Sequence, residues 1–449
     1  MKNISYTLLL LTVLFGSTTA QELSPFLFGQ NHWIEQNDED GRPGYINQLW
    51  PKIAESGIKL VRIGGNNYNN RNHELFNLDR IKLNSILDSI RGIGAEPLFQ
   101  IPSGKGETRD LTVDQVVQLV KEYKYQNGKG IRYYCIGNEP LLHDRDGIPK
   151  VYEYVMKLAP AMKGADPTIK IFIFDACYLF EEPHKKVLGG ELDLTGKDKN
   201  GNWMIDGINF HRYPGAKSRD NVVFTGPKDI RRQVEQLMEM MEFANKKHGR
   251  KGSERLQWGL TEFNVTTSNP NREIAGIGNT SFLGGQFMAE IYGLGMEFGA
   301  FTMAPWCISE TDRVSTDFGY LGLPSEFYPR SSYYHTQLMA QNMKGAYLPT
   351  ESNNSYVKTI ASKSDTEISV MIMNSDQYND FEFDLILNDE SPSTKPLTVR
   401  ADLGMEIVIS DNIPNQTTLM LVLSGSGEII RKYSYGLKQN LKYLPPILE

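Results

Sequence analysis

Cysteine and histidine are scarce in this chain: 3 Cys and 7 His occur among 449 residues. Because Cys135, Cys177 and Cys307 each fall in or just after an apolar run, we interpret them as buried free thiols and not as partners in a disulfide. The histidines show no His-Glu-x-x-His or similarly paired spacing, so the usual sequence pattern of a catalytic zinc site is absent. We therefore expect no metal and no cofactor.

An excess of positive charge is also lacking. The 54 acidic residues outnumber the 47 basic ones, and the formal net charge is −7. Proteins that bind nucleic acid need a basic surface, so this balance argues against a nucleic-acid partner. The 22 Tyr, 20 Phe and 5 Trp instead supply aromatic faces of the kind that pack on the C–H faces of sugar rings. A polysaccharide or oligosaccharide suits this composition better, and the oligomeric state is left open.

No apolar run reaches the roughly 20 residues that a membrane-spanning helix needs. The run at residues 6–15 follows a short basic start and precedes small residues at Thr18 and Ala20. This order is typical of a cleavable signal peptide over residues 1–20. The residue directly after the predicted cleavage point is Gln21 and not a cysteine, so we expect a secreted or periplasmic protein without a lipid anchor.

Eight short apolar runs alternate with helix-like segments in the first three quarters of the chain. The runs lie at residues 26–33, 59–65, 96–103, 132–140, 169–176, 205–213, 256–265 and 300–307. Apolar residues repeat at three- and four-residue spacing in residues 45–56, 79–93, 112–126, 150–162, 229–247, 280–297 and 333–344. This alternation predicts parallel βαβ units, and eight of them favour a closed (β/α)8 TIM barrel, of the α/β class, over residues 21–345.

The pattern of apolar and polar residues changes after residue 345. Short strand-like runs at 356–360, 367–373, 381–387, 398–400, 405–409, 418–424 and 429–433 are broken by Asn, Asp, Ser, Gly and Pro, with no helical pattern between them. Such spacing predicts a small C-terminal β-sandwich over residues 346–449.

Two glutamates stand at the ends of the fourth and seventh runs, Glu139 in the sequence GNEP and Glu262 in the sequence TEF. A TIM barrel carries its chemistry at the C-terminal ends of its strands, so both carboxylates are expected at the barrel mouth. Cleavage of a glycosidic bond needs such a pair, one group to protonate the leaving oxygen and one to attack or to activate water. Because side chains alternate along a strand, we also expect Cys135, Trp258 and Leu260 to line the barrel interior below the glutamates.

The Asn-Glu-Pro triplet on the fourth strand and the Glu on the seventh resemble clan A of the glycoside hydrolases, a superfamily of retaining (β/α)8 enzymes. The resemblance covers about residues 26–345, and a β-sandwich often accompanies the barrel in that clan. It implies that Glu139 is the general acid/base and Glu262 the nucleophile, with carboxyl groups about 5–5.5 Å apart. It also implies that Asn138 binds the 2-hydroxyl of the sugar.

Four further residues are similar to the clan's pattern. His211 and Tyr213 end the sixth run in the order His-x-Tyr, which implies a place beside the nucleophile. Trp306, at the end of the eighth run, resembles the aromatic floor of a sugar subsite. Arg62, on the second run, resembles the arginine that keeps the nucleophile ionised. The alternatives are that Trp306 is ordinary core and that Arg62 belongs to a structural ion pair.

The expected substrate is inferred from motifs that are less distinctive than those around the two glutamates. The sequences FGQNHW at 28–33 and RIGGN at 62–66 are similar to motifs of secreted endo-enzymes such as laminarinases, and they add His32, Trp33 and Asn66 as candidate substrate contacts. We therefore expect a retaining endo-β-glycanase, with β-1,3-glucan as the first substrate to test. The alternatives are an exo-acting glycosidase similar to arabinofuranosidases and xylosidases, an enzyme of the agarase and porphyranase type, and a carbohydrate-binding protein built on an inactive barrel.

Overall fold

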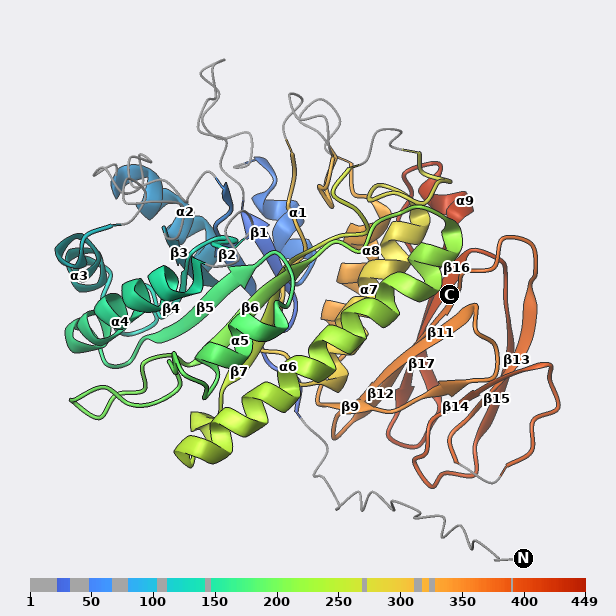
Figure 1. Ribbon diagram of the computed structural model, residues 1–449. Helices are drawn as coiled ribbons and strands as arrows, with labels where there is room; N and C mark the ends of the chain where they lie inside the picture. The colour runs from blue at the N-terminus through green and yellow to red at the C-terminus, as the bar shows by residue number, and fades with distance from the viewer. Residues whose placement is uncertain are drawn as a thin grey trace, which may run out of the picture.

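The computed structural model describes residues 22–32, 48–66, 80–102, 111–141, 147–268, 273–310, 317–322, 328–388 and 391–449. The segment predicted as a signal peptide lies outside these ranges. Figure 1 shows a barrel with helices around it and, beside it, a second body made of strands from the C-terminal part of the chain. None of the helices in the described ranges has both the length and the apolarity needed to cross a bilayer.

Eight parallel strands form the barrel, each paired with the next in chain order. A parallel bridge between Phe28 and Met303 connects the first strand to the last. The strands are β1 (Gly29–His32), β2 (Leu60–Ile63), β3 (Glu96–Ile101), β4 (Tyr133–Ile136), β5 (Lys170–Ala176), β6 (Gly207–Arg212), β7 (Gln257–Phe263) and β8 (Thr302–Met303). Each lies within one of the predicted runs, and the predicted fold class is confirmed.

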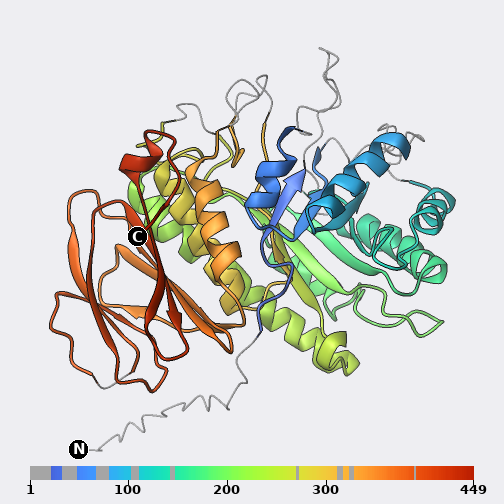
Figure 2. The ribbon, with the colours of Figure 1, turned by 180° about the vertical axis from the view of Figure 1, so that it is seen from behind.

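Helices cover the outside of the barrel (Figures 1 and 2). They are α1 (Trp50–Glu55), α2 (Arg80–Gly92), α3 (Val113–Glu122), α4 (Ile148–Ala165), α5 (Glu181–Val187), α6 (Gly226–His248), α7 (Phe282–Glu297) and α8 (Ser331–Asn342), with short helical turns at Asn221–Thr225 and Gly252–Glu254. The sequence pattern identifies all of these helices except α5. That helix has seven residues, one of them Pro183, which is too short a segment for a helical repeat to be visible.

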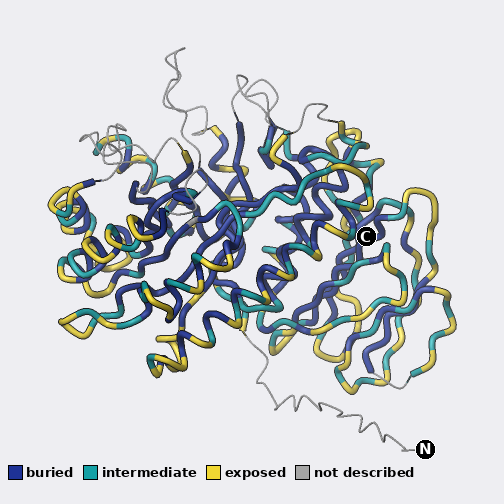
Figure 3. The backbone as a smooth tube through the Cα atoms, viewed as in Figure 1, coloured by how far each residue is buried: buried dark blue, intermediate teal, exposed yellow. Residues whose placement is uncertain are grey.

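The barrel wall separates two apolar layers. A small cluster fills the interior and comes mainly from β2 to β5; its buried members are Leu60, Leu98, Tyr133, Cys135, Phe172 and Phe301. The outer faces of the strands pack against the helices in a much larger core, and Figure 3 shows the strands buried along their length. Cys135 therefore lies inside, as expected. None of the three cysteines forms a disulfide, as predicted, and Cys135 and Cys307 are buried. Cys177 is partly exposed, so the expectation that it is buried is wrong.

The prediction that Trp258 and Leu260 line the interior is wrong. Both belong to the outer core, and Trp258 Nε1 donates a hydrogen bond to the Phe298 carbonyl at the end of α7. The cause is an irregularity in β7, because Leu260 pairs with Phe210 whereas His211 pairs with Glu262. Thr261 is thus an extra residue, and it reverses the alternation of side chains just before Glu262.

Two sheets make up the C-terminal body. The six-stranded sheet has the order β18-β17-β16-β12-β11-β9 and the four-stranded sheet the order β10-β14-β13-β15. The strands are β9 (Ala346–Leu348), β10 (Glu351–Ser352), β11 (Val357–Lys363), β12 (Glu367–Asn374), β13 (Phe381–Ile386), β14 (Leu397–Arg400), β15 (Val408–Ile413), β16 (Thr417–Ser424), β17 (Ile429–Gly436) and β18 (Ile447–Leu448), with α9 (Leu437–Asn440) after β17. The sequence pattern misses β9, β10 and β18, which have two or three residues each. The predicted β-sandwich is confirmed.

The six-stranded sheet is buried on both faces. On β12, Ile368, Val370 and Ile372 pack into the core between the two sheets, whereas the alternate residues Met371 and Met373 belong to the core shared with the barrel. Figures 1 and 2 show α7 and α8 between the barrel strands and this sheet. One face of the six-stranded sheet packs on the four-stranded sheet, and the other packs on the helices of the barrel. The sandwich and the barrel therefore form one continuous packed structure.

A charged pair lies in this contact. Glu290 on α7 is 3.7 Å from Lys358 Nζ on β11. Burial raises the pKa of Glu290 to about 7, although the charges of Lys358 and Arg231 oppose the shift. The folded protein therefore binds a proton at Glu290 over a pH range in which the unfolded chain does not.

We expect Glu290→Gln to stabilise the protein increasingly as the pH rises from about 5 to about 8. Over this window the unfolded chain releases the Glu290 proton more readily than the folded protein does, so the wild type loses stability as the pH rises. A glutamine side chain does not ionise and avoids this loss. The gain in unfolding free energy should reach about 1–2 kcal/mol at the alkaline end. Thermal unfolding across a pH series measures it. Glu239→Gln, on the exposed side of α6, is the control, and a gain that does not change with pH would contradict the assignment.

Candidate active site

Glu262, at the end of β7, is held by two hydrogen-bond donors. Arg62 Nη1 from β2 lies 2.9 Å from one carboxylate oxygen, and the Tyr213 hydroxyl lies 3.0 Å from the other. Only 9% of the Glu262 side chain is exposed. Burial raises the pKa of Tyr213 well above 10, and the charges of Glu262 and Glu139 raise it further, so Tyr213 remains a donor. Both contacts stabilise the ionised form of Glu262.

Arg62 is fully buried and joins several strands of the barrel. Besides Glu262, its guanidinium donates to Asn31 Oδ1 on β1 at 2.8 Å, to Gln100 Oε1 on β3 at 3.1 Å and to Asn138 Oδ1 after β4 at 2.6 Å. Glu262 is thus the anionic member of this set and the other three are neutral amides. Arg62 thus pairs with the carboxylate for which the clan resemblance implies such an arginine.

Glu139 follows β4 in a left-handed backbone conformation, with φ of +48°. A residue with a Cβ rarely adopts this conformation, which costs about 1–3 kcal/mol and occurs mostly at functional sites. The turn brings the Glu139 carboxylate to His211 on β6, whose Nδ1 is 3.0 Å from Oε1. The Glu139 side chain is 12% exposed, so it is mostly buried but retains some contact with solvent.

The two glutamates meet around His211. One carboxylate oxygen of each and one ring nitrogen of His211 all lie within 4.8 Å of one another, and His211 Nδ1 is 3.5 Å from Glu262 Oε2. Carboxyl groups are about 5–5.5 Å apart in retaining glycosidases and about 6.5–9.5 Å apart in inverting ones. The closest carboxylate oxygens of Glu139 and Glu262 lie within 4.8 Å of each other, which favours the shorter of these two separations.

Two carboxylates and an imidazole are also the side-chain types that bind a divalent metal. In this site, however, the Arg62 guanidinium already contacts Glu262 and places a fixed positive charge beside any ion that the trio would hold. The donor set therefore fits a proton-transfer site, in which Glu262 is kept ionised, better than a metal site.

Trp306 forms a further wall. Its indole Nε1 donates to Glu310 Oε1 at 3.0 Å, and 9% of the residue is exposed. Its ring lies against Gly65, where an added Cβ would come within 2.5 Å of the ring and where φ is +111°. Only glycine satisfies both the close approach and the backbone conformation. Trp306 is therefore fixed in orientation, as a sugar platform needs to be, and is not free to turn within the core.

Not all of the remaining predicted substrate contacts lie near Glu139 and Glu262. Asn66 accepts a hydrogen bond from Asn138 Nδ2 at 3.2 Å, which links it to the Arg62 group. His32 is buried and stacks on Trp50 of α1 with ring centroids 6.0 Å apart, so its side chain packs into the helical layer. Burial lowers its pKa to about 4. This position does not support His32 as a substrate contact. Trp33 lies outside the described residues.

The sequence analysis missed three residues of this site. Asn31 and Gln100 end β1 and β3, and the rule that active-site groups follow barrel strands could have identified both. Besides binding Arg62, Asn31 Nδ2 donates to the carbonyl of Thr261, the extra residue of β7, at 2.8 Å. Glu310 lies beyond β8 and carries no sequence signal, because its role depends on the orientation of Trp306.

No protein-family model matches the chain, and no curated protein sequence does. Solved structures match its fold. The α-L-arabinofuranosidase from Thermotoga maritima, in complex with arabinose, has a TM-score of 0.64 at 13% identity, with 90% of this chain and 97% of that chain covered. The family 44 xyloglucanase from Paenibacillus polymyxa has a TM-score of 0.61 at 13% identity, covering 90% and 97%.

The family 44 endoglucanase from Clostridium thermocellum is similar, with a TM-score of 0.60 at 12% identity and coverage of 90% of this chain and 98% of that chain. At such identities the likeness is one of fold. The comparisons span the barrel and the sandwich together, so they confirm, for this chain, the fold that the clan A resemblance implies.

Proposed function

We propose that this protein is a retaining glycoside hydrolase in which Glu262 is the nucleophile and Glu139 the general acid/base. The observation that carries the proposal is that the two carboxylates meet around His211, while the buried Arg62 guanidinium and the Tyr213 hydroxyl donate to Glu262. Two equal carboxylates would have interchangeable roles. In this site one is held ionised by a buried cation, and the other contacts an imidazole that can exchange a proton with it.

The first half of the reaction forms a covalent intermediate. Glu262 attacks the anomeric carbon while the bond from that carbon to the leaving oxygen breaks. Glu139 donates a proton to the leaving oxygen, so the leaving group departs as a neutral alcohol. The negative charge on Glu262 is used up in the new ester, and Glu139 becomes a carboxylate beside His211.

The second half restores both groups. Glu139 takes a proton from a water molecule, the resulting oxygen nucleophile attacks the anomeric carbon, and the ester bond to Glu262 breaks. The released sugar keeps its original anomeric configuration because two displacements have occurred at the same carbon. A carbohydrate-binding protein on an inactive barrel would have no need to hold two carboxylates so close together with different partners.

The proposed substrate is a β-linked polysaccharide cut internally, with β-1,3-glucan to be tested first. Similar folds in a xyloglucanase and an endoglucanase support internal cleavage of a polymer. The similarity to α-L-arabinofuranosidases favours a second candidate, removal of terminal arabinofuranose units. Export through the N-terminal signal peptide stays part of the proposal.

The reaction products distinguish internal cleavage of a polysaccharide from removal of terminal arabinofuranose. Purified protein is incubated with laminarin, xyloglucan and arabinoxylan, and with 4-nitrophenyl α-L-arabinofuranoside. An endo-enzyme gives a ladder of oligosaccharides from one polymer at early times, whereas an arabinofuranosidase gives free arabinose and cleaves the aryl arabinofuranoside. Proton NMR of the first product shows whether its anomeric configuration is retained, and inversion would contradict the double displacement.

Substitution of the two glutamates should affect different steps. Glu262→Ala cannot form the glycosyl-enzyme, so turnover should collapse on every substrate, and added azide should restore it with inverted configuration. Glu139→Ala should lose about 10²–10⁴-fold on natural sugars, because the leaving oxygen has no proton donor. An aryl glycoside needs little protonation and should still form the intermediate in a rapid burst. Equal loss on natural and aryl substrates in the first step, or substantial activity in Glu262→Ala, would show that the roles are wrongly assigned.

Tyr213→Phe removes only the hydroxyl that donates to Glu262. A hydrogen bond to a charged group is worth about 1.5–3 kcal/mol, so kcat/KM should fall about 10- to 100-fold. The acidic limb of the pH–rate profile should also move to higher pH, because the ionised carboxylate has lost a donor. The control is Tyr154→Phe, which removes a tyrosine hydroxyl bonded to the Pro102 carbonyl, away from the glutamates. If both variants behave alike, the contact of Tyr213 with Glu262 has no special part in the reaction.

A further inference from the structure

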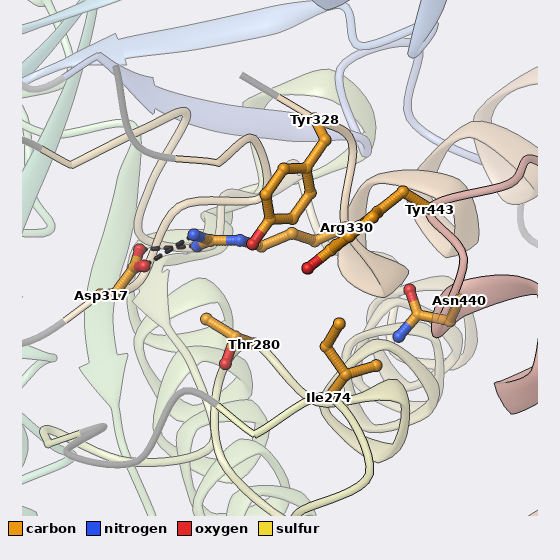
Figure 4. A pocket seen from close by; sticks show the side chains of 7 residues that line it. All are labelled: Ile274, Thr280, Asp317, Tyr328, Arg330, Asn440 and Tyr443. Atoms are coloured by element: carbon orange, nitrogen blue, oxygen red, sulfur yellow. Dashed lines mark hydrogen bonds and ion pairs between the residues drawn. The ribbon is translucent and has the colours of Figure 1, made fainter. Parts of the chain in front are cut away.

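A polar cavity lies between the barrel loops and the end of the chain. Its volume is about 230 Å³, and it is lined by Ile274, Thr280, Asp317, Tyr328, Arg330, Asn440 and Tyr443. The first two precede α7, the next three precede α8, and the last two come from α9 and the residues after it. Figure 4 shows these side chains arranged around a common space. The cavity is thus built jointly by the barrel and the C-terminal segment.

One wall presents a buried donor that has no hydrogen-bond partner among the described residues. Asn440 is 3% exposed, and its Nδ2 makes no hydrogen bond. Its Oδ1 accepts a hydrogen bond from Tyr435 at 2.8 Å, which fixes the amide group. In Figure 4 the amide nitrogen of Asn440 points into the cavity. A buried donor without a partner is unfavourable, so a ligand that supplies an oxygen acceptor at this position gains a hydrogen bond to a donor that has already lost its contact with water.

The opposite wall is polar but carries no net charge. Arg330 is 4% exposed and donates with both Nη1 and Nη2 to the two oxygens of Asp317, each at 2.6 Å. The ion pair between Arg330 and Asp317 has no net charge, so the cavity would not select a ligand of either charge. A neutral ligand rich in oxygen atoms fits the cavity better than a carboxylate, a phosphate or an amine.

Two tyrosines supply the flat apolar surface. The rings of Tyr328 and Tyr443 pack against each other, with centroids 4.0 Å apart and planes inclined by 46°, so each ring supports the other and the outer face of Tyr443 is left for a ligand. Tyr443 is 46% exposed, so its ring reaches solvent at the mouth of the cavity. Aromatic faces beside hydroxyl and amide donors are a combination that suits a sugar ring, which has C–H faces and a rim of hydroxyl groups.

The cavity is connected to the glutamates by a short path of contacts. Phe318, the neighbour of Asp317, packs edge-on against Tyr213 with ring centroids 5.9 Å apart, and Tyr213 donates to Glu262. The Phe318 carbonyl also accepts a hydrogen bond from the backbone N–H of Cys307, the residue after Trp306. The cavity therefore borders the same loops that shape the candidate active site, on the side of the sandwich.

We propose that this cavity is a secondary carbohydrate site that holds one neutral sugar unit of the polysaccharide, away from the bond that is cut. The assignment rests on the proposed function for the identity of the ligand. It adds that the segment after α9 takes part in binding the polymer, with Tyr443 as the stacking surface and Asn440 as the donor to a ring or hydroxyl oxygen.

The test uses the full-length protein carrying Glu262→Ala, so that nothing is turned over. Laminaripentaose, cellopentaose, xyloglucan heptasaccharide and arabinopentaose are titrated by calorimetry. In this background Tyr443→Ala should weaken binding of the preferred oligosaccharide about 3- to 10-fold, as expected for the loss of one stacked ring. Asn440→Asp keeps the acceptor for Tyr435 but removes the donor, and it should weaken binding at least as much. Leu444→Ala, at a neighbouring residue that is 48% exposed, is the control and should have no effect.

In the active protein the same variants should raise KM for the polymer and leave kcat/KM for a 4-nitrophenyl monosaccharide unchanged. Loss on the polymer alone supports the site. Unchanged binding of the pentasaccharides in both variants overturns it, while hydrolysis by the wild type leaves the proposed function intact. If the wild type hydrolyses none of the substrates but Tyr443→Ala still weakens oligosaccharide binding, the proposed function fails and the sugar site stands. If none of the oligosaccharides binds to the Glu262→Ala protein, the site is refuted.

Discussion

The ion pair between Arg62 and Glu262 is the interaction on which the rest of the candidate active site depends. A guanidinium with no exposed surface requires a counter-charge and several acceptors, which are supplied by residues on strands β1, β3 and β7 and by Asn138 just after β4. Removal of any one partner would cost the fold a buried hydrogen bond to a charged group. The contacts that favour the ionised form of Glu262 are therefore also the contacts that hold the ends of several barrel strands together.

The order of the elements could be predicted from the sequence because it depends on local patterns. Parallel strands buried on both faces give continuous apolar runs, and the helices between them give a clear three- to four-residue repeat. The elements that escaped prediction, α5, β9, β10 and β18, are too short to contain such a repeat. The glutamates were identifiable because the end of a barrel strand is a local position that carries a fixed place in space.

Other parts of the site could not be read from the sequence because they depend on contacts between distant residues. The extra residue Thr261 in β7 reverses the alternation of side chains, and its presence is apparent only from the pairing with β6. His32 stands in a strand-end motif but stacks on Trp50, a neighbour that the motif does not specify. Glu310 and the cavity beside α9 likewise follow from how loops meet, which no repeat in the sequence encodes.

The burial of Arg62 also has a consequence for how the site responds to pH. An arginine side chain is not deprotonated in proteins, so its positive charge is permanent. Arg62 is fully buried, and its guanidinium lies 2.9 Å from a carboxylate oxygen of Glu262. A lysine or a histidine could lose its charge when buried in the same position, whereas Arg62 keeps a positive potential beside Glu262 at every pH at which the protein is folded.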